Sequence, residues 1–223
     1  MPPMELQRCH HGRAPAPAQG VRSGAVQERT LCVGATALFV ADHGGSRAIP
    51  TRSRDDLRVP APPVQAVRGD ITGEQVDAIV NAANNRLARG AGVCGAIFAG
   101  AGPELDRACA ALGGCTTGDA VVTDAFALPA RWIVHTVGPV WHGGERGEPD
   151  LLRSCYRRSI EVARDAGARS IAFPAISTGI FGYPPDAAAE IAVESVRAHG
   201  SDMLVRLVAF DAETLRRYES LLS

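Results

Sequence analysis

The feature that most constrains the fold is a stretch in which an apolar strand runs into a polar loop and then into a glycine-rich turn. The residues from Asp77 to Gly95 have the sequence DAIVNAANNRLARGAGVCG. The short apolar run at 77–80 is typical of a buried strand. The apolar series that continues from Val93 predicts a helix directly after the glycines. The loop between them therefore lies at a strand's carboxyl end, where open α/β sheets bind their ligands.

The same stretch carries groups suited to holding a phosphate. Asn81 and Asn84 offer amides that both donate and accept hydrogen bonds. Gly90, Gly92 and Gly95 allow positive φ and a close approach of the backbone to a ligand, and the free N–H groups of a helix N-terminus attract anions. An ordinary strand-to-helix connection would use similar turn residues, so this stretch alone leaves both interpretations open.

From Val64 onward, strand-like and helix-like stretches alternate, which predicts a three-layer α/β domain. Strands are expected near 64–68, 77–81, 119–123, 131–137, 169–173 and 204–210. Helices are expected near 93–101, 103–112, 149–166, 186–198 and 212–222. Pro103 suits the first turn of its helix, and Asp186 is expected to cap the helix that ends at Gly200.

Residues 1–63 differ in character from the rest of the chain. They contain an alternating Ala/Pro run at 14–18, many arginines and glycines, and a single apolar run at 31–41. That run is too short to span a bilayer and too far from the N-terminus to serve as a secretory signal. We therefore expect a disordered extension at 1–63 ahead of one folded domain at 64–223.

Composition excludes several classes of function. The formal net charge of −1 gives no overall attraction to nucleic acid or to acidic membranes. The six cysteines form no CxxC pair, and the cluster Cys9, His10 and His11 has no further ligands nearby, so neither a metal site nor a disulfide framework is indicated. We expect a cytoplasmic protein that needs no metal or cofactor and has no membrane partner, and the charge does not favour nucleic acid as a partner.

A second loop at a strand end also suits a phosphate. After the apolar run at 170–173 the chain has the sequence PAISTGIFGYP at 174–184, with two hydroxyls and two glycines among apolar residues. Its backbone amides could hold a phosphate while Phe181 covers a sugar, or the loop could be a tight structural turn. Earlier in the chain, Asp70 could accept a hydrogen bond from the amine of a base or cap the turn that follows it.

Together these motifs resemble those of a macrodomain. The resemblance rests on five motifs in macrodomain order and spacing: GDIT at 69–72, NAAN at 81–84, the glycine turn at 90–95, HTVGPVW at 135–141 and PAISTGIFGYP at 174–184. It extends over 64–223 and is nearest to the MacroD-type branch, which includes O-acetyl-ADP-ribose deacetylases and mono-ADP-ribosyl hydrolases. It implies a three-layer α/β/α fold with a mixed, largely parallel six-stranded sheet. It also implies ADP-ribose, free or attached to a protein, as the ligand.

The resemblance further implies a role for each site residue. The adenine would be held by the carboxylate of Asp70, the backbone N–H of Ile71 and the ring of Phe210. Backbone amides would enclose the diphosphate from two sides, namely Gly92, Val93 and Cys94 on one and Ser177, Thr178, Gly179, Ile180 and Phe181 on the other. Asn84 would bind the distal ribose, while Asn81 would hold the loop and touch the same sugar.

One departure from the family pattern bears on catalysis. MacroD enzymes carry an aspartate directly after the valine of the glycine turn, where this chain has Cys94, and a histidine four residues later, where it has Phe98. The histidine that precedes the glycines in related hydrolases is Arg89 here. Three interpretations of Cys94 stay open: a small inert residue, a thiolate that acts as base or nucleophile, and a redox-sensitive position. His135 lies inside an apolar run and is expected to belong to the core.

Two main functional hypotheses follow. The first is a hydrolase that removes ADP-ribose from esterified carboxylates, or acetate from O-acetyl-ADP-ribose, with a water oriented near Asn84 and Cys94 whose proton passes to a substrate phosphate. The second is a reader that binds ADP-ribose and leaves it intact. A third is a binder of other nucleotides or RNA ends. The hydrolase is preferred because the MacroD resemblance extends well outside the pocket.

Overall fold

The computed structural model describes residues 64–223, and the expected extension at 1–63 lies outside the described residues. The strands are β1 (Val64–Arg68), β2 (Ala78–Ala82), β3 (Ala120–Asp124), β4 (Trp132–Thr136), β5 (Ser170–Phe173) and β6 (Leu204–Ala209). The helices are α1 (Gly92–Ala101), α2 (Glu104–Leu112), α3 (Glu148–Asp165), α4 (Pro185–His199) and α5 (Ala212–Leu222), with a short 3₁₀ turn, η2 (Ile71–Gly73). Every predicted strand and helix is confirmed, with ends within about one residue of the prediction.

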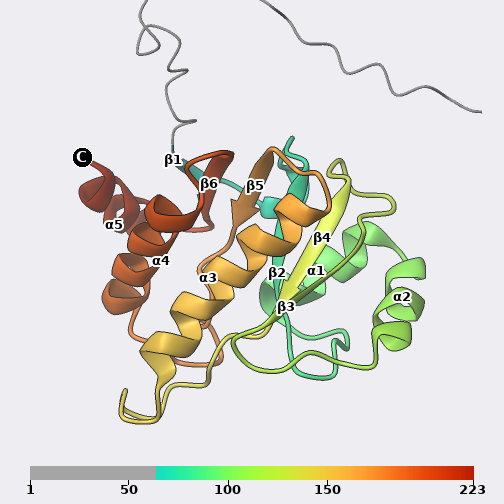
Figure 1. The fold of residues 1–223 in the computed structure, drawn as a ribbon, viewed down its shortest axis with the longest axis horizontal. Helices are drawn as coiled ribbons and strands as arrows, with labels where there is room; N and C mark the ends of the chain where they lie inside the picture. The colour runs from blue at the N-terminus through green and yellow to red at the C-terminus, as the bar shows by residue number, and fades with distance from the viewer. Residues whose placement is uncertain (1–63) are drawn as a thin grey trace, which may run out of the picture. The chain divides into compact units, whose positions relative to one another are not determined.

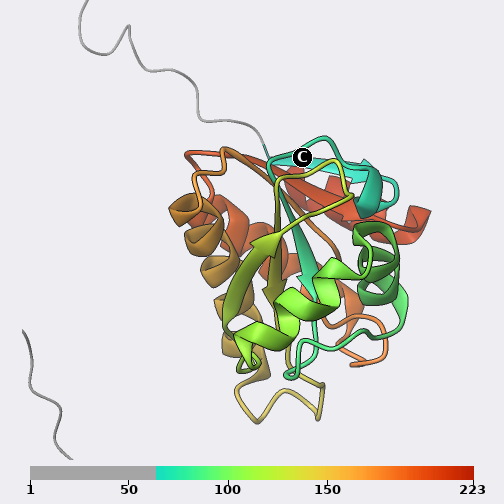
Figure 2. The same cartoon turned by 90° about the vertical axis from the view of Figure 1, so that its right-hand side faces the viewer.

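The strands form one mixed sheet in the order β1-β6-β5-β2-β4-β3. All neighbours are parallel except β3 and β4, which are antiparallel, so the predicted fold class is confirmed. Because the carboxyl ends of parallel strands share one edge of a sheet, the loops that follow β2, β4 and β5 converge there. Figures 1 and 2 show these loops gathered at the same end of the domain.

Helices cover both faces of the sheet. One core cluster joins the sheet to α3, α4 and α5, and the other joins it to α1, α2 and η2. Successive side chains of β2 alternate between them, with Ala78 and Val80 in the first cluster and Ile79 in the second. Since both faces of β2 are buried, its first three residues, Ala78, Ile79 and Val80, are all apolar instead of alternating with polar ones. Of the helices described between residues 64 and 223, none combines the length and apolar character that crossing a membrane requires.

The predicted capping role of Asp186 is wrong. Helix α4 begins one residue earlier, at Pro185, because proline is well suited to the first helical position. Asp186 lies within the first turn, where its carboxylate accepts a hydrogen bond from Arg217 of α5 at 2.5 Å. Gly200 follows the last helical residue, as expected.

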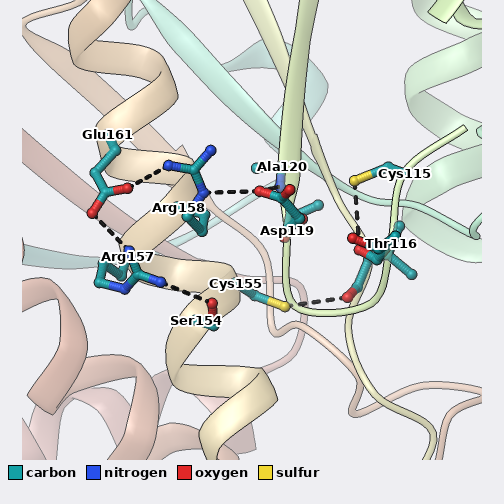
Figure 3. A network of polar contacts seen from close by, with 11 residues as sticks. Cys115, Thr116, Asp119, Ala120, Ser154, Cys155, Arg157, Arg158 and Glu161 are labelled. Carbon is teal, nitrogen blue, oxygen red and sulfur yellow. Dashed lines mark hydrogen bonds and ion pairs between the residues drawn. The ribbon is translucent and has the colours of Figure 1, made fainter.

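A chain of ion pairs joins α3 to the segment that leads into the edge strand β3 (Figure 3). Arg158 donates to Asp119 at 2.8 Å and to Glu161 at 2.6 Å, and Arg157 also donates to Glu161 at 2.9 Å. The hydrogen bond from Arg158, followed by that from the N–H of Ala120, lowers the pKa of Asp119. These contacts hold α3 along the edge of the sheet.

Candidate functional site

A pocket of about 170 Å³ lies among the loops that follow β2, β4 and β5. The predicted site residues that line it are Asn84, Gly92, Val93, Cys94, Ser177, Gly179, Ile180 and Phe181. The two loops that the sequence indicated as phosphate sites therefore form opposite parts of one pocket. Their residues are about 90 positions apart in the chain and meet only through the parallel pairing of β2 with β5.

A larger and more open hollow of about 630 Å³ lies between α4 and α5. Three of its charged groups are paired with one another, because Arg217 donates to both Asp186 and Glu213. Its lining comes entirely from α4 and α5 and includes none of the residues of the two loops that the sequence indicated. We therefore assign the functional site to the smaller pocket.

The first wall of the pocket is the N-terminus of α1. Helix α1 begins at Gly92, and the residue before it, Ala91, provides no side-chain cap. The first N–H groups of the helix, at 92–94, therefore lack the side-chain acceptor that usually satisfies such groups. Gly92 has φ of +60°, which favours glycine, whereas Gly95 is needed for close packing, because a Cβ there would lie 2.7 Å from the carbonyl oxygen of Gly90.

The second wall is the loop at 177–181, in which three of the five carbonyl groups accept hydrogen bonds from the protein. The carbonyls of Ser177, Gly179 and Phe181 accept from Tyr183, Gly182 and Trp141 at 2.8–3.0 Å. Within residues 64–223, the backbone N–H groups of 177–181 donate to no protein acceptor. The Thr178 hydroxyl is directed back to the carbonyl of Ala175 at 3.0 Å. A row of free N–H groups of this kind suits an anion.

Gly138, which the sequence analysis did not single out, lies where the β4–α3 loop meets this second wall. A Cβ at Gly138 would lie 2.1 Å from Ser177 Oγ and 2.8 Å from Ile176 Cγ2. The Ser177 hydroxyl is buried and has no hydrogen-bond partner among the described residues. A signal for Gly138 was present in the sequence, since the HTVGPVW motif places a glycine directly after an apolar run.

Asn84 organises its own loop and still presents a donor to the pocket. Its Nδ2 donates to the carbonyl of Ala88 at 2.6 Å, and its Oδ1 accepts from the N–H groups of Arg86 and Ala88 at 3.1 and 3.2 Å. An amide nitrogen carries two hydrogens, so one N–H remains for a ligand. The side-chain oxygen is fully used by the loop.

Asn81 lies beneath the pocket rather than in its lining. The side chain is fully buried, and its Nδ2 lies 3.7 Å from Cys94 Sγ and 3.1 Å from His135 Nδ1. Because the amide donates to Nδ1, we assign the imidazole proton to Nε2, which lies 2.9 Å from Thr123 Oγ1. Desolvation lowers the pKa of His135 to about 4, so the ring is neutral near pH 7. The contact of Asn81 with Cys94 fits a role in holding the loop, whereas its expected contact with the sugar stays a prediction.

Among the residues that line the pocket, Cys94 is the one with a titratable side chain. It is buried, with a relative exposure of 4%. Its Sγ lies 3.8 Å from the carbonyl oxygen of Ala88, inside the bend of the Asn84 loop. Among the described residues, neither a carboxylate nor an imidazole lines the pocket, and no group of three or more His, Cys, Asp or Glu side chains is placed to hold a metal. Arg89, which precedes the glycines, points to α2 and pairs with Asp106 at 3.0 Å.

The residues expected to hold the adenine lie at the carboxyl ends of β1 and β6. Asp70 Oδ1 accepts from the N–H and the hydroxyl of Thr72 at 2.9 and 2.8 Å, so Asp70 caps η2. Its second oxygen accepts no hydrogen bond from residues 64–223. Ile71 is the first residue of η2, where an N–H has no partner within the turn. Phe210 follows β6 and is 83% exposed, an unusual position for an aromatic ring.

Comparison with known proteins gives a consistent result. The model of the Macro domain family matches residues 80–192. The chain is 52% identical to a macro domain-containing protein of Ralstonia nicotianae, over 75% of this chain and 98% of that protein. It is 49% identical to an O-acetyl-ADP-ribose deacetylase of Citrobacter rodentium, over 72% of this chain and 95% of that protein.

Solved structures agree with the sequence relatives. A variant of the Oceanobacillus iheyensis macrodomain, solved with ADPR, superimposes with a TM-score of 0.70 at 39% identity, over 73% of this chain and 92% of that one. The Trypanosoma brucei macrodomain in complex with ADP-ribose superimposes with a TM-score of 0.66 at 43% identity, over 72% of this chain and 69% of that one. The chain belongs to the macro domain family.

Proposed function

We propose that the protein binds ADP-ribose in this pocket and hydrolyses ADP-ribosyl esters, either on mono-ADP-ribosylated protein or in O-acetyl-ADP-ribose. The observation that carries the proposal is that two rows of free backbone N–H groups, at 92–94 and 177–181, line the same pocket. A diphosphate carries two negative charges, and neutral donors of this kind bind it without any lysine or arginine in the lining. Relatives named O-acetyl-ADP-ribose deacetylase support the ester as substrate.

The chemistry that fits these residues is positioning rather than base catalysis by the protein. The free N–H of Asn84 would hold the distal ribose, and a water would lie between that sugar and the Cys94 loop. With no carboxylate or imidazole in the described lining, the water's proton would pass to an oxygen of the substrate diphosphate. The water oxygen would bond to the reacting carbon of the ester as the ester C–O bond breaks. The products would be ADP-ribose and the free carboxylate, and the proton would then be released from the diphosphate to solvent. Orientation and backbone N–H groups would lower the barrier, because they stabilise charge that develops at fixed positions.

The test is the release of ADP-ribose from a protein modified on its carboxylates, measured for wild type and two variants. Cys94→Ala should keep the wild-type rate within a few-fold, because the thiol performs no step. Cys94→Asp should raise the rate by about 10²–10⁴-fold, the usual contribution of a general base placed near the water. Cys109→Ala is the matched control, since Cys109 is also a buried thiol but does not line the pocket.

A reader that binds ADP-ribose without cleaving it is the second candidate. It is favoured by the absence of a carboxylate or imidazole from the described lining of the pocket. Binding without turnover by both wild type and Cys94→Asp would establish the reader. A more than hundredfold loss of rate in Cys94→Ala with normal binding, together with inactivation of wild type by a thiol reagent, would make Cys94 catalytic instead.

A further inference from the structure

Backbone N–H groups of the loop at 139–147, between β4 and α3, donate hydrogen bonds to a buried carboxylate. Glu148 is the first residue of α3 and is 2% exposed. Its Oε1 accepts from the N–H groups of His142 and Gly144 at 3.0 and 3.4 Å, and its Oε2 accepts from that of Arg146 at 2.6 Å. A buried carboxylate is costly unless it is paired, and here three backbone donors compensate it.

The charged form of Glu148 is the one that fits this arrangement. Burial by itself raises the pKa of Glu148, but the backbone N–H donors that surround the carboxylate outweigh it, and the pKa is lower than the ordinary value. The carboxylate is therefore ionised near pH 7. An ionised acceptor makes stronger hydrogen bonds to N–H groups than a neutral one does.

The loop that Glu148 holds is in turn packed against the second wall of the pocket. The N–H of Trp141 donates to the carbonyl of Phe181 at 2.8 Å. The indole ring of Trp141 lies against Tyr183, with ring centroids 4.6 Å apart. The same ring lies close to Gly144, where a Cβ would lie only 2.8 Å from Trp141 Cη2. A continuous series of contacts therefore runs from Glu148 through the loop to the residues that end the 177–181 segment.

We propose that Glu148 is a positioning residue that pre-organises the 177–181 wall for its ligand, acting through residues 141–146. Glu148 does not line the pocket and so would not touch the ligand. A wall that is already held in place loses less conformational freedom on binding, and this raises affinity without adding a contact. The proposal rests on the proposed function for the identity of the ligand, but the bracing itself can be measured without any ligand.

The experiment compares Glu148→Gln with Glu145→Gln in the full chain. Glutamine has nearly the same shape as glutamate but replaces one acceptor oxygen with a donor that would face a backbone N–H. Glu145 lies in the same loop and is exposed, so its variant controls for the loss of one negative charge there. Hydrogen exchange of backbone amides is followed without ligand, and the Kd for ADP-ribose is measured by calorimetry.

We expect Glu148→Gln to accelerate hydrogen exchange about tenfold or more at the backbone amides of Trp141, Gly182 and Tyr183. These N–H groups donate to carbonyl groups of the second wall. Exchange in β5 should stay as in wild type. The Kd for ADP-ribose should rise about tenfold, which is about 1.4 kcal/mol. Glu145→Gln should match wild type in both measurements.

Faster exchange confined to 142–146, with Gly182, Tyr183 and the Kd unchanged, would overturn the proposal and leave Glu148 as a local clamp. Acceleration at Gly182 and Tyr183 in a protein whose wild type binds no ADP-ribose would support the brace and reject the proposed function. Gly144→Ala provides a second route if Glu148→Gln does not fold, because it disturbs Trp141 and leaves the carboxylate in place. Unchanged exchange at Gly182 and Tyr183 in Gly144→Ala would also overturn the proposal.

Discussion

The two ends of β2 differ in whether the protein itself supplies hydrogen-bond partners for the polar groups there. At the amino end, Asp77 Oδ2 accepts from the N–H of Arg169 at 2.8 Å and from the N–H and hydroxyl of Ser170 at 3.0 Å, and the N–H of Asp77 donates to Ser170 Oγ at 2.8 Å. At the carboxyl end, the N–H groups of 92–94 have no side-chain cap, and those of 177–181 have no protein acceptor within residues 64–223. One end holds the sheet together and the other is left available for a ligand, so stability and binding should be separable by mutation.

The largest effect is expected from a substitution that crowds the second wall, at the carboxyl end of β2. Gly138→Ala would place a Cβ against Ser177 Oγ, at a distance of 2.1 Å if nothing moved, so the second wall must shift. We expect the Kd for ADP-ribose to rise at least about a hundredfold, or about 2.7 kcal/mol, as measured by calorimetry. Adding Ser177→Gly removes the nearest clashing atom and should recover part of the affinity. Normal binding by the single variant would show that the wall adapts freely.

Substitutions at the amino end of β2 should change the stability of the fold rather than the affinity for the ligand. Asp77→Ala leaves the donors of Arg169 and Ser170 without their charged acceptor and should lower the free energy of unfolding by about 2–3 kcal/mol in urea titrations. The N–H of Arg169, ahead of the other causes, lowers the pKa of Asp77. The stabilisation is therefore present above the unfolded pKa, about 3.9, and is lost as the pH falls through the folded value.

The affinity of the folded Asp77→Ala variant for ADP-ribose should equal that of wild type. Asp124→Ala, which removes an exposed carboxylate at the end of β3, is the control and should change neither quantity. Weaker binding of ADP-ribose by the folded Asp77→Ala variant would show that the two ends of β2 are coupled.

A smaller effect should separate the two roles of Asp70 at the adenine end. Asp70→Asn keeps an Oδ1 that can cap Thr72 but replaces the free oxygen with a donor, which cannot accept from an amine of the base. We expect ADP-ribose to bind about tenfold more weakly, roughly 1.5 kcal/mol, with binding of ribose 5-phosphate unchanged in the same calorimetric assay. Equal losses for both ligands would assign Asp70 to folding alone.

The smallest effect concerns the pH dependence of stability that the buried His135, beneath the pocket, should cause. His135 has a pKa of about 4 in the fold, whereas an unfolded histidine has one near 6.5. The unfolded chain therefore takes up the proton first as the pH falls, and the free energy of unfolding should drop by about 1 kcal/mol between pH 7 and 5.5. In His135→Gln the drop should be smaller by this amount. Identical pH dependence in both proteins would mean that the pKa of His135 is the same in the folded and the unfolded chain.

Much of the fold and part of the site were predictable from local patterns. The apolar run at 77–80 and the glycines after it identified a strand, a loop and a helix start, because periodicity and glycine content reflect local backbone preference. The same reasoning indicated the two loops whose residues line the pocket. It failed at Asp186, where a proline one residue earlier begins the helix instead.

By itself, the sequence pattern predicted the order of strands and helices, the α/β class of the domain and the two loops that line the pocket, while the largely parallel sheet was implied by the macrodomain resemblance. Only the tertiary structure decided that Asn81 is buried beneath the pocket, that Gly138 packs on Ser177 and that Glu148 holds a loop beside the second wall. The reason is physical: backbone preference is set by near neighbours in the chain. The burial and hydrogen-bond partners of a side chain depend on segments that meet only when the sheet assembles.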